Sequence, residues 1–443
     1  MSAFSQSICS RPTFLWYSWN IVEYQDVNTD EHLQRYCKSL AQCDSIAFDT
    51  EFVSEDTYRP VLCLVQVAAD GQLAVIDSLA INDMTPFWEV LAAPGHETIV
   101  HAGRSETEFC LQAIGRPPAG LFDVQLAAGF AGAEYPAGFA SLISKFLGHS
   151  PPKHETRTDW RHRPLTKRQI EYALNDAHYL PPLRDVLSAR LDELGRSAWF
   201  DDEMVQWRQD IERSLSQDRW RRISGIAGLD SRSLAVVREL YRWRESEAQR
   251  RDQPVRRILR DDLLIELARR GSADVKRIRA VRGMERGDLL RRIGDIAVRI
   301  QQGLELAEVE CPQRVPRDQM PQLSVLGQFL FAALGSICRQ AHLAPNLVAT
   351  PNDIRELIAY RTARGKSRTQ SGGEPAAEKA DGHAKAPTGA AKDKDLVPPL
   401  ARGWRAEFVG RLFDDLLAGK VSIRITDPRS DHPLTFEDFT LPM

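Results

Sequence analysis

The chain has 443 residues, of which 43% are hydrophobic and 27% are charged, and its formal net charge is −3. These values are typical of a globular protein in water, and the length predicts two to four domains of about 100–200 residues each. The sequence contains no apolar run near the roughly 18 residues that a membrane-spanning helix needs. We therefore expect no membrane partner.

The seven cysteines are scattered along the chain, and no Cys-x-x-Cys pair occurs. This arrangement argues against a zinc site and against a disulfide framework, and it favours a reducing compartment. We therefore expect a cytoplasmic protein, and we take a monomer as its expected state.

The first half of the chain predicts a domain in which strands and helices alternate, after an N-terminal extension over residues 1–30. Strands are predicted for short apolar runs at 45–52, 61–68, 73–77, 98–101 and 121–123. Helices are predicted at 30–40, 85–92, 105–114, 139–147 and from Thr166 onward. The first three strands follow one another as in an antiparallel meander. We therefore predict an α/β fold over residues 31–222, with a mixed sheet, flanking helices and a helical connector at its end.

Two all-helical units are predicted after this domain, at 223–310 and 316–425. The second is interrupted at 365–395 by a tract without large apolar side chains. Such a tract cannot bury enough apolar surface to offset the entropy of ordering, so we predict disorder there. Residues 426–443 are expected to form a loosely held tail.

The first helical unit is the basic part of this mildly acidic chain. Residues 231–306 hold 19 Lys and Arg against 12 Asp and Glu, an excess of seven. A basic segment of this kind indicates a polyanion partner, with solvated basic helix faces as the alternative.

The strand Ile46–Phe52 carries two acids, Asp49 and Glu51. Residues two apart on a strand point to the same face, so both carboxylates face one way. Two carboxylates on an apolar strand repel each other unless a cation or a set of donors compensates. The pattern predicts half of a divalent-metal site, and the alternative is an exposed strand face.

Three further acids are candidates for the same site. Tyr172 and Asp176 lie four residues apart, on one face of a predicted helix. The tyrosine can orient a water and the acid can hold a cation, or the pair can be structural. Glu106 follows a predicted strand and opens a helix, where an acid also complements the helix dipole. Asp123 ends another strand, where a helix cap is the alternative.

A basic and aromatic stretch precedes the Tyr172 helix. It contains Arg157, Trp160, Arg161, Arg163, Lys167 and Arg168. Cations and a large aromatic side chain are the groups that contact phosphates and bases. A solvated loop is the alternative.

In this order, the motifs resemble those of the DEDD exonucleases in their Tyr-bearing branch, and most closely the ribonuclease D family, which has a ribonuclease H-like fold. The matching residues are Asp49-Thr50-Glu51-Phe52-Val53, Tyr58-Arg59-Pro60 with Leu64 and Gln66, His101-Ala102-Gly103, Asp123 with Gln125, Arg157-Thr158-Asp159-Trp160, Arg163-Pro164-Leu165-Thr166, and Tyr172 with Asp176. The first helical unit is similar to the HRDC domain that RecQ-type helicases share with this family. The second, with Gly403-Trp404-Arg405 and Glu407, resembles another such domain.

The resemblance implies 3′–5′ hydrolysis of RNA that releases nucleoside 5′-monophosphates, with trimming of tRNA precursors as the role. It implies two divalent cations, Mg²⁺ or Mn²⁺, held by Asp49, Glu51, Glu106 and Asp176, with Tyr172 orienting the attacking water. The expected partner is RNA with a free 3′ end, and DNA is a second possible substrate. The residues expected to contact nucleic acid are Phe52, His101, Arg157, Trp160 and Arg163.

One departure from the family pattern concerns Glu106, because the family has Asp at this position. The longer side chain either supports the second cation or weakens its site. Two rival functions therefore stay open: an RNA-binding protein with a decayed nuclease site, and a 3′–5′ DNA exonuclease.

Overall fold

The structure is a computed structural model that describes residues 23–150, 158–216, 219–313, 321–370, 397–431 and 433–439. One six-stranded mixed sheet has the order β1-β4-β3-β2-β5-β6. Its strands are β1 (Tyr24–Val27), β2 (Ser45–Val53), β3 (Val61–Ala69), β4 (Gln72–Ile76), β5 (Glu97–Val100) and β6 (Leu121–Asp123). β2, β3 and β4 pair antiparallel, and β1, β5 and β6 join by parallel pairing. The predicted mixed sheet is confirmed.

The turn between β3 and β4 has the expected Asp70-Gly71, and both residues have positive φ. β1 was not predicted. It lies within the segment 1–30, which was expected to be an extension, and it pairs with β4. That boundary was wrong, because Val27 is fully buried against the sheet. Residues 1–22 lie outside the described part of the chain.

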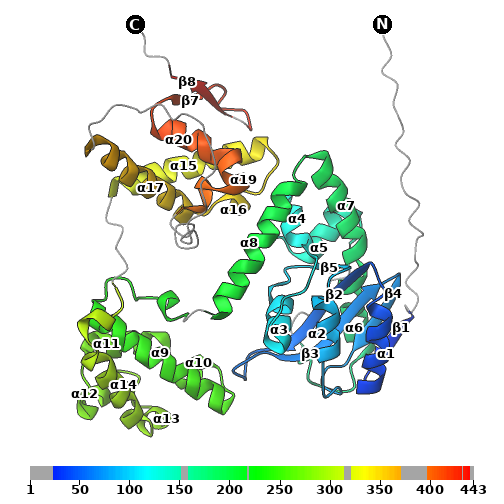
Figure 1. The fold of residues 1–443 in the computed structure, drawn as a ribbon, viewed down its shortest axis with the longest axis horizontal. Helices are drawn as coiled ribbons and strands as arrows, with labels where there is room; N and C mark the ends of the chain where they lie inside the picture. The colour runs from blue at the N-terminus through cyan, green and yellow to red at the C-terminus, as the bar shows by residue number, and fades with distance from the viewer. Residues whose placement is uncertain are drawn as a thin grey trace, which may run out of the picture.

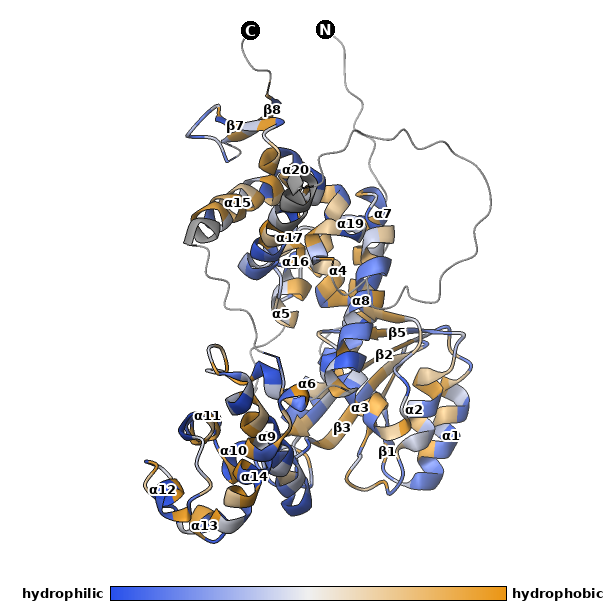
Figure 2. Ribbon diagram, turned by 60° about the vertical axis from the view of Figure 1, so that its left-hand side comes forward, coloured by the Kyte–Doolittle hydropathy of each residue, from blue (hydrophilic) through white to orange (hydrophobic). Residues whose placement is uncertain are grey.

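Helices cover both faces of the sheet (Figure 1). On one face lie α1 (Asp30–Leu40), α2 (Thr85–Ala92) and α3 (Arg104–Ile114), around a core that includes Phe48, Phe87 and Trp88. On the other lie α4 (Val124–Phe130), α6 (Lys167–His178) and α7 (Leu180–Glu193), with α5 (Phe139–Leu142) and the π-helical turn η1 (Ile143–Leu147) beside them. Figure 2 shows the central strands β2 and β3 as largely hydrophobic, as expected for a sheet covered on both faces.

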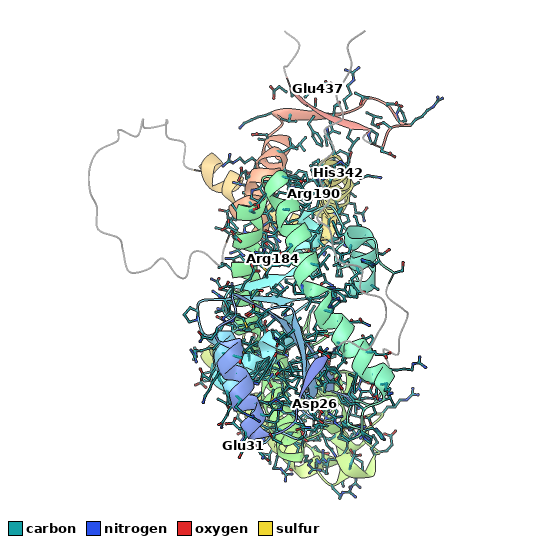
Figure 3. The ribbon with its side chains drawn as sticks, turned by 90° about the vertical axis from the view of Figure 1, so that its right-hand side faces the viewer. Asp26, Glu31, Arg184, Arg190, His342 and Glu437 are labelled. Atoms are coloured by element: carbon teal, nitrogen blue, oxygen red, sulfur yellow. The ribbon has the colours of Figure 1, made fainter. Side chains whose placement is uncertain are left out.

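α7 is tied to the sheet by a charge pair. The Arg184 guanidinium lies 2.6 Å, Nε to Oε2, from the Glu97 carboxylate at the start of β5. Figure 3 labels Arg184 and Arg190 along this helix. The pair is partly buried and fixes α7 across the end of the sheet.

The first helical unit has a core of its own, distinct from those of the sheet domain. Its elements are η2 (Arg219–Arg222), α9 (Ser231–Arg251), α10 (Val255–Ile258), α11 (Asp261–Arg270), α12 (Val275–Arg279), α13 (Gly287–Leu290), α14 (Ile293–Glu305) and η3 (Glu308–Glu310). α9 and α14 pack so closely that a Cβ at Gly303 would lie 2.6 Å from the Val236 Cα. The loop between β2 and β3 contacts this unit: Tyr58 donates its backbone N–H to Asp252 and its hydroxyl to Glu245.

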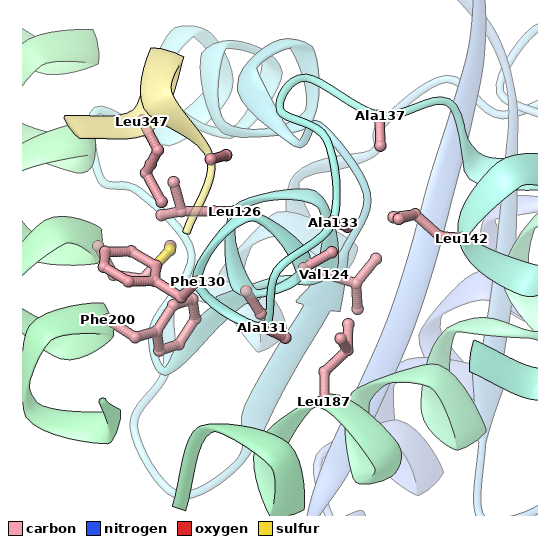
Figure 4. Packing of buried hydrophobic residues seen from close by; sticks show 14 of the residues in the cluster. Val124, Leu126, Phe130, Ala131, Ala133, Ala137, Leu142, Leu187, Phe200 and Leu347 are labelled. Carbon is pink, nitrogen blue, oxygen red and sulfur yellow. The ribbon is translucent and has the colours of Figure 1, made fainter. Parts of the chain in front are cut away.

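The second helical unit packs on the sheet domain through a shared core. Its elements are α15 (Pro321–Gln340), α16 (Pro345–Val348), α17 (Pro351–Gln370), η5 (Pro399–Ala401), α19 (Gly403–Arg405), η6 (Ala406–Gly410) and α20 (Arg411–Leu417). α8 (Ser197–Ser216) is the predicted connector, and its Phe200 belongs to the same core as Phe130 and Leu347 (Figure 4). The Trp404 ring lies 5.0 Å from that of Phe130.

Two details of this unit differ from the prediction. α17 continues to Gln370, so the segment 365–370 of the predicted disordered insert is helical, and the prediction for 371–395 falls on residues that the structure does not describe. Residues after 425 were expected to form a loose tail, yet β8 (Leu434–Asp438) pairs antiparallel with β7 (Val421–Ile425). Alternating apolar residues, among them Ile423 and Phe436, account for this hairpin.

Among the described residues, no helix combines the length and the apolar character needed to cross a membrane.

Candidate active site

Three acids converge on one point of the sheet domain. Asp49, Glu51 and Asp176 each offer a carboxylate oxygen, and these three atoms all lie within 4.8 Å of one another. Strand alternation brings the first two to one face of β2, and α6 crosses that face and contributes the third. The convergence of the strand acids with the Tyr172 helix, as the sequence suggested, is therefore present in the structure.

The register of the sheet places a partner directly opposite Asp49. Gln66 of β3 pairs with Asp49 across the strands, and its Nε2 donates to Asp49 Oδ2 over 2.9 Å. The register shifts between Glu51 and Phe52, which marks a bulge just after the acids. The Phe52 ring then packs edge-on against Phe109, at 5.5 Å between ring centroids.

The helix α6 is fixed at its start by the predicted capping box. Thr166 accepts from the Gln169 backbone, and the Gln169 side chain accepts from the Thr166 backbone N–H. The loop before it is anchored by Arg163, whose guanidinium makes two bonds to Asp77, of 2.6 and 2.7 Å, and one to the Cys63 carbonyl. This anchoring sets where Tyr172 enters the site.

Tyr172 faces the acids. Its hydroxyl lies near Asp176 and Glu51, and its ring lies 6.1 Å from that of Trp160. Burial, followed by the nearby Asp176 and Glu51, raises the pKa of the Tyr172 hydroxyl above its ordinary value of about 10. The raised pKa keeps the hydroxyl neutral at physiological pH, which suits an orienting role.

Glu106 reaches the site from the other face of the sheet. It lies on α3, and the Thr50 hydroxyl donates to its Oε1 over 2.6 Å. Thr50 alternates with Asp49 and Glu51, so it points away from their face. Both partners are buried, with 6% of Thr50 and 4% of Glu106 exposed. Glu106 is consequently not one of the three acids whose oxygens cluster within 4.8 Å, although its charge bears on Asp49 and Glu51.

The start of α3 is held by Asp123. One Asp123 carboxylate accepts from the backbone N–H groups of Ala102, Gly103, Gln125 and Leu126. Asp123 therefore acts as the helix cap of α4, which was the alternative to a fourth metal ligand. Gly103 is required here because a Cβ would lie 2.3 Å from Val100 Cγ2.

The carboxyl groups of Asp49, Glu51, Glu106 and Asp176 all have raised pKa values. Burial is the main cause that raises the pKa of Asp49 to about 6, of Glu106 and Asp176 to about 8, and of Glu51 to about 9. Mutual repulsion adds to it, because Asp49 raises the pKa of each of the other three. Clustered acids with these values need a cation to ionise together near neutrality, and carboxylate oxygens are the ligands that Mg²⁺ and Mn²⁺ prefer. The residues present therefore fit a divalent-metal site.

Three residues expected to contact nucleic acid have partners within the fold. Trp160 is only 5% exposed and packs in the core, so its ring offers no open face for a base. Arg163 uses its donors on Asp77 and on backbone carbonyls, which leaves it poorly suited to a phosphate. The His101 ring contacts the Ala137 carbonyl at 3.1 Å and packs on Phe139. The burial of Trp160 counts against base stacking, and contact of Arg163 and His101 with nucleic acid stays a prediction.

The prediction for Phe52 stays open, and Arg157 lies outside the described residues. Two residues of the site, Gln66 and Thr50, were not predicted to take part in it. A signal for Gln66 was present, because it is the polar residue in the otherwise apolar run Val61–Ala69. A signal for Thr50 was absent, because its bond to Glu106 depends on how α3 packs.

Comparison with known proteins agrees with this geometry. Residues 24–192 match a family described as 3′-5′ exonuclease, and residues 233–297 match the HRDC domain. Ribonuclease D of Zymomonas mobilis is 34% identical over 346 residues, which cover 74% of this chain and 85% of that protein. The chain belongs to the ribonuclease D family. Ribonuclease D of Escherichia coli is 30% identical over 408 residues, covering 89% of this chain and 99% of the relative.

A solved structure extends the likeness to the fold of nearly the whole chain. The Escherichia coli RNase D structure, described as that of an exoribonuclease involved in structured RNA processing, superposes with a TM-score of 0.75 at 27% identity. The match covers 90% of this chain and 99% of that one. As a member of this family, the protein is a metal-dependent 3′–5′ exoribonuclease with an HRDC domain.

Proposed function

We propose that the protein removes nucleotides one at a time from RNA 3′ ends, releasing nucleoside 5′-monophosphates, and that tRNA precursors are among its substrates. The observation that carries this proposal is the meeting of Asp49, Glu51 and Asp176 beside the neutral hydroxyl of Tyr172. This set of groups supports assignment to the Tyr-bearing branch of the DEDD exonucleases.

The roles of the acids follow from their positions. Asp49, Glu51 and Asp176 would hold two divalent cations, Mg²⁺ or Mn²⁺. Such cations, when bound, supply an activated water and stabilise charge on the leaving oxygen. Tyr172 orients the attacking water through its hydroxyl, which lies near Asp176. Glu106 accepts a hydrogen bond from Thr50 on the other face of the sheet. It would support the second cation through its charge near Asp49, without being one of the three clustered acids.

The substrate strand is guided by the surfaces around the acids. Phe52 follows Glu51 at the bulge in β2, where its ring can hold the terminal nucleotide. The basic HRDC domain would add salt-dependent phosphate contacts that tolerate any sequence. We further propose that the second helical unit is also HRDC-like and that Arg157 contacts the RNA.

We also propose that the protein is a cytoplasmic monomer. The six cysteines among the described residues are free thiols, which supports a reducing compartment.

The test compares matched RNA and DNA single strands of one sequence, labelled at the 5′ end, with Mg²⁺ or Mn²⁺ and with EDTA as the control. The proposal predicts stepwise shortening of RNA from the 3′ end that EDTA abolishes. Faster shortening of DNA than of RNA would contradict the proposed substrate. Binding of RNA without any shortening would favour a decayed nuclease site.

A further inference from the structure

Gln66 is a fully buried amide at the edge of the acid cluster. It lies on β3, its exposed fraction is 0%, and it faces Asp49 across the strand pair. Its Nε2 donates to Asp49 Oδ2 over 2.9 Å. A hydrogen bond to an ionised acceptor is short and strong, so this one fixes the rotation of the Asp49 carboxylate.

The other end of the same amide is unpaired. Among the described residues, Gln66 Oε1 is a buried oxygen without a hydrogen-bond partner. Its neighbours along that face of β3 are Leu64 and Ala68, which offer no donor. A buried acceptor left unpaired destabilises the fold, and each such group in a native protein calls for an explanation.

A methionine or leucine at this position would avoid the unpaired oxygen, and a glutamate would add another negative charge beside Asp49. An amide supplies a donor for the carboxylate and an acceptor close by. The free acceptor belongs to the same amide group as the donor to Asp49, so it lies close to the Asp49 carboxylate. None of the described residues supplies the missing donor, and a water that enters the site would pair this oxygen.

We propose that Gln66 is a positioning residue for the cation site: its Nε2 holds Asp49, and its Oε1 accepts a hydrogen bond from a water that enters with the cation. This inference rests on the proposed function and adds a determinant of metal affinity to it. Hydrogen-bonding partners of metal-ligating carboxylates typically change metal affinity or activity by about 10–100-fold when they are removed.

The experiment measures Mn²⁺ binding to the full-length protein by calorimetry, together with thermal unfolding in EDTA. The variant Gln66→Met keeps the length of the side chain and removes both polar ends. We expect its Mn²⁺ affinity to fall by about 10–100-fold. We expect its melting temperature in EDTA to change little, because the unpaired oxygen is removed together with the bond to Asp49.

Three further variants make the result specific. Gln66→Asn keeps the amide but is one methylene shorter, so it should lose Mn²⁺ affinity as Gln66→Met does even if the latter folds poorly. Thr98→Val removes a buried polar group from β5 of the same sheet and should leave Mn²⁺ affinity unchanged. Asp49→Asn removes a proposed cation ligand, and its Mn²⁺ affinity is the reference for the loss of a ligand.

Two results would overturn the inference. Mn²⁺ affinity within about twofold of wild type in both Gln66 variants would show that Gln66 has no role in the cation site, while the proposed function would stand. A lower melting temperature with unchanged Mn²⁺ affinity would show a purely structural role. By contrast, a wild-type protein that binds no Mn²⁺ would overturn the proposed function itself.

Discussion

The bond between Thr50 and Glu106 gives the sharpest prediction, because it concerns the acid that departs from the family pattern. The Thr50 hydroxyl donates to Glu106 Oε1 over 2.6 Å, and both groups are buried. Glu106→Asp shortens the side chain by one carbon–carbon bond, about 1.5 Å. The acceptor then lies roughly 4 Å from the hydroxyl, beyond hydrogen-bond distance. Loss of this bond leaves the buried Thr50 hydroxyl without its acceptor, which should lower the free energy of unfolding by about 1–3 kcal/mol.

The assay is a double-mutant cycle of Glu106→Asp and Thr50→Val, with urea unfolding in EDTA. Each single variant removes the same bond, so the double variant should be less destabilised than the sum of the two by about 1–3 kcal/mol. Glu106→Asp should retain RNA turnover of the wild-type order, because an acid stays on the same turn of α3. Additive destabilisation would refute the proposed coupling. Loss of turnover at unchanged stability would show that Glu106 serves the chemistry through its length.

Three further predictions concern the cation site and the packing of the second helical unit. Tyr172→Phe should lower kcat strongly and leave Mn²⁺ affinity near wild type, because the hydroxyl orients water and is not needed as a ligand; an equal loss of Mn²⁺ affinity would contradict this role. The raised pKa of Glu51, about 9, means that the folded metal-free protein binds more protons than the unfolded chain. In EDTA, stability should therefore fall as pH rises from about 4 to about 9, and the increase in melting temperature on adding Mn²⁺ should grow over the same window; a flat profile would contradict the shifted pKa. Glu203 accepts a hydrogen bond from Trp404 Nε1 over 2.9 Å and forms an ion pair with Arg405. Glu203→Ala should therefore lower the free energy of unfolding, measured in urea, by about 3–5 kcal/mol. A change below about 1 kcal/mol would contradict the role of this ion pair in holding the second helical unit.

Local rules were enough to predict much of the site. Strand alternation places Asp49 and Glu51 on one face, and helix spacing places Tyr172 one turn from Asp176. The capping box at Thr166 also depends on a few neighbouring residues, and the structure contains it. What the sequence pattern alone did not supply was the meeting of strand and helix, for which the resemblance to a known family was needed.

The features that were not predicted depend on contacts between distant segments. Thr50 is 56 residues from Glu106, and Arg163 is 86 residues from Asp77. A basic loop residue is open to a phosphate or to an acid elsewhere in the chain, and only the packed structure shows that Arg163 faces an acid. The same holds for Trp160, whose large ring suits a base stack or a core equally well until its burial is known.

Secondary structure at the two ends of the chain was also missed for a physical reason. β1 is four residues long, and its stability comes from pairing with β4 rather than from its own sequence. The β7–β8 hairpin lies in a segment rich in charged residues, and this composition led to the prediction of a loose tail. The alternation of apolar and polar residues around Ile423 in β7 and Phe436 in β8 is too short to be a strong strand signal.

The central claim is that Asp49 anchors a metal-dependent nuclease site, and one measurement tests it most directly. Wild type and Asp49→Asn are compared at equal concentration on a 5′-labelled RNA with Mg²⁺, with products resolved by length and RNA binding measured in parallel. The account predicts that wild type shortens the RNA from its 3′ end, releasing nucleoside 5′-monophosphates. It predicts that Asp49→Asn binds the RNA but does not shorten it. Turnover by Asp49→Asn near the wild-type rate would contradict the claim.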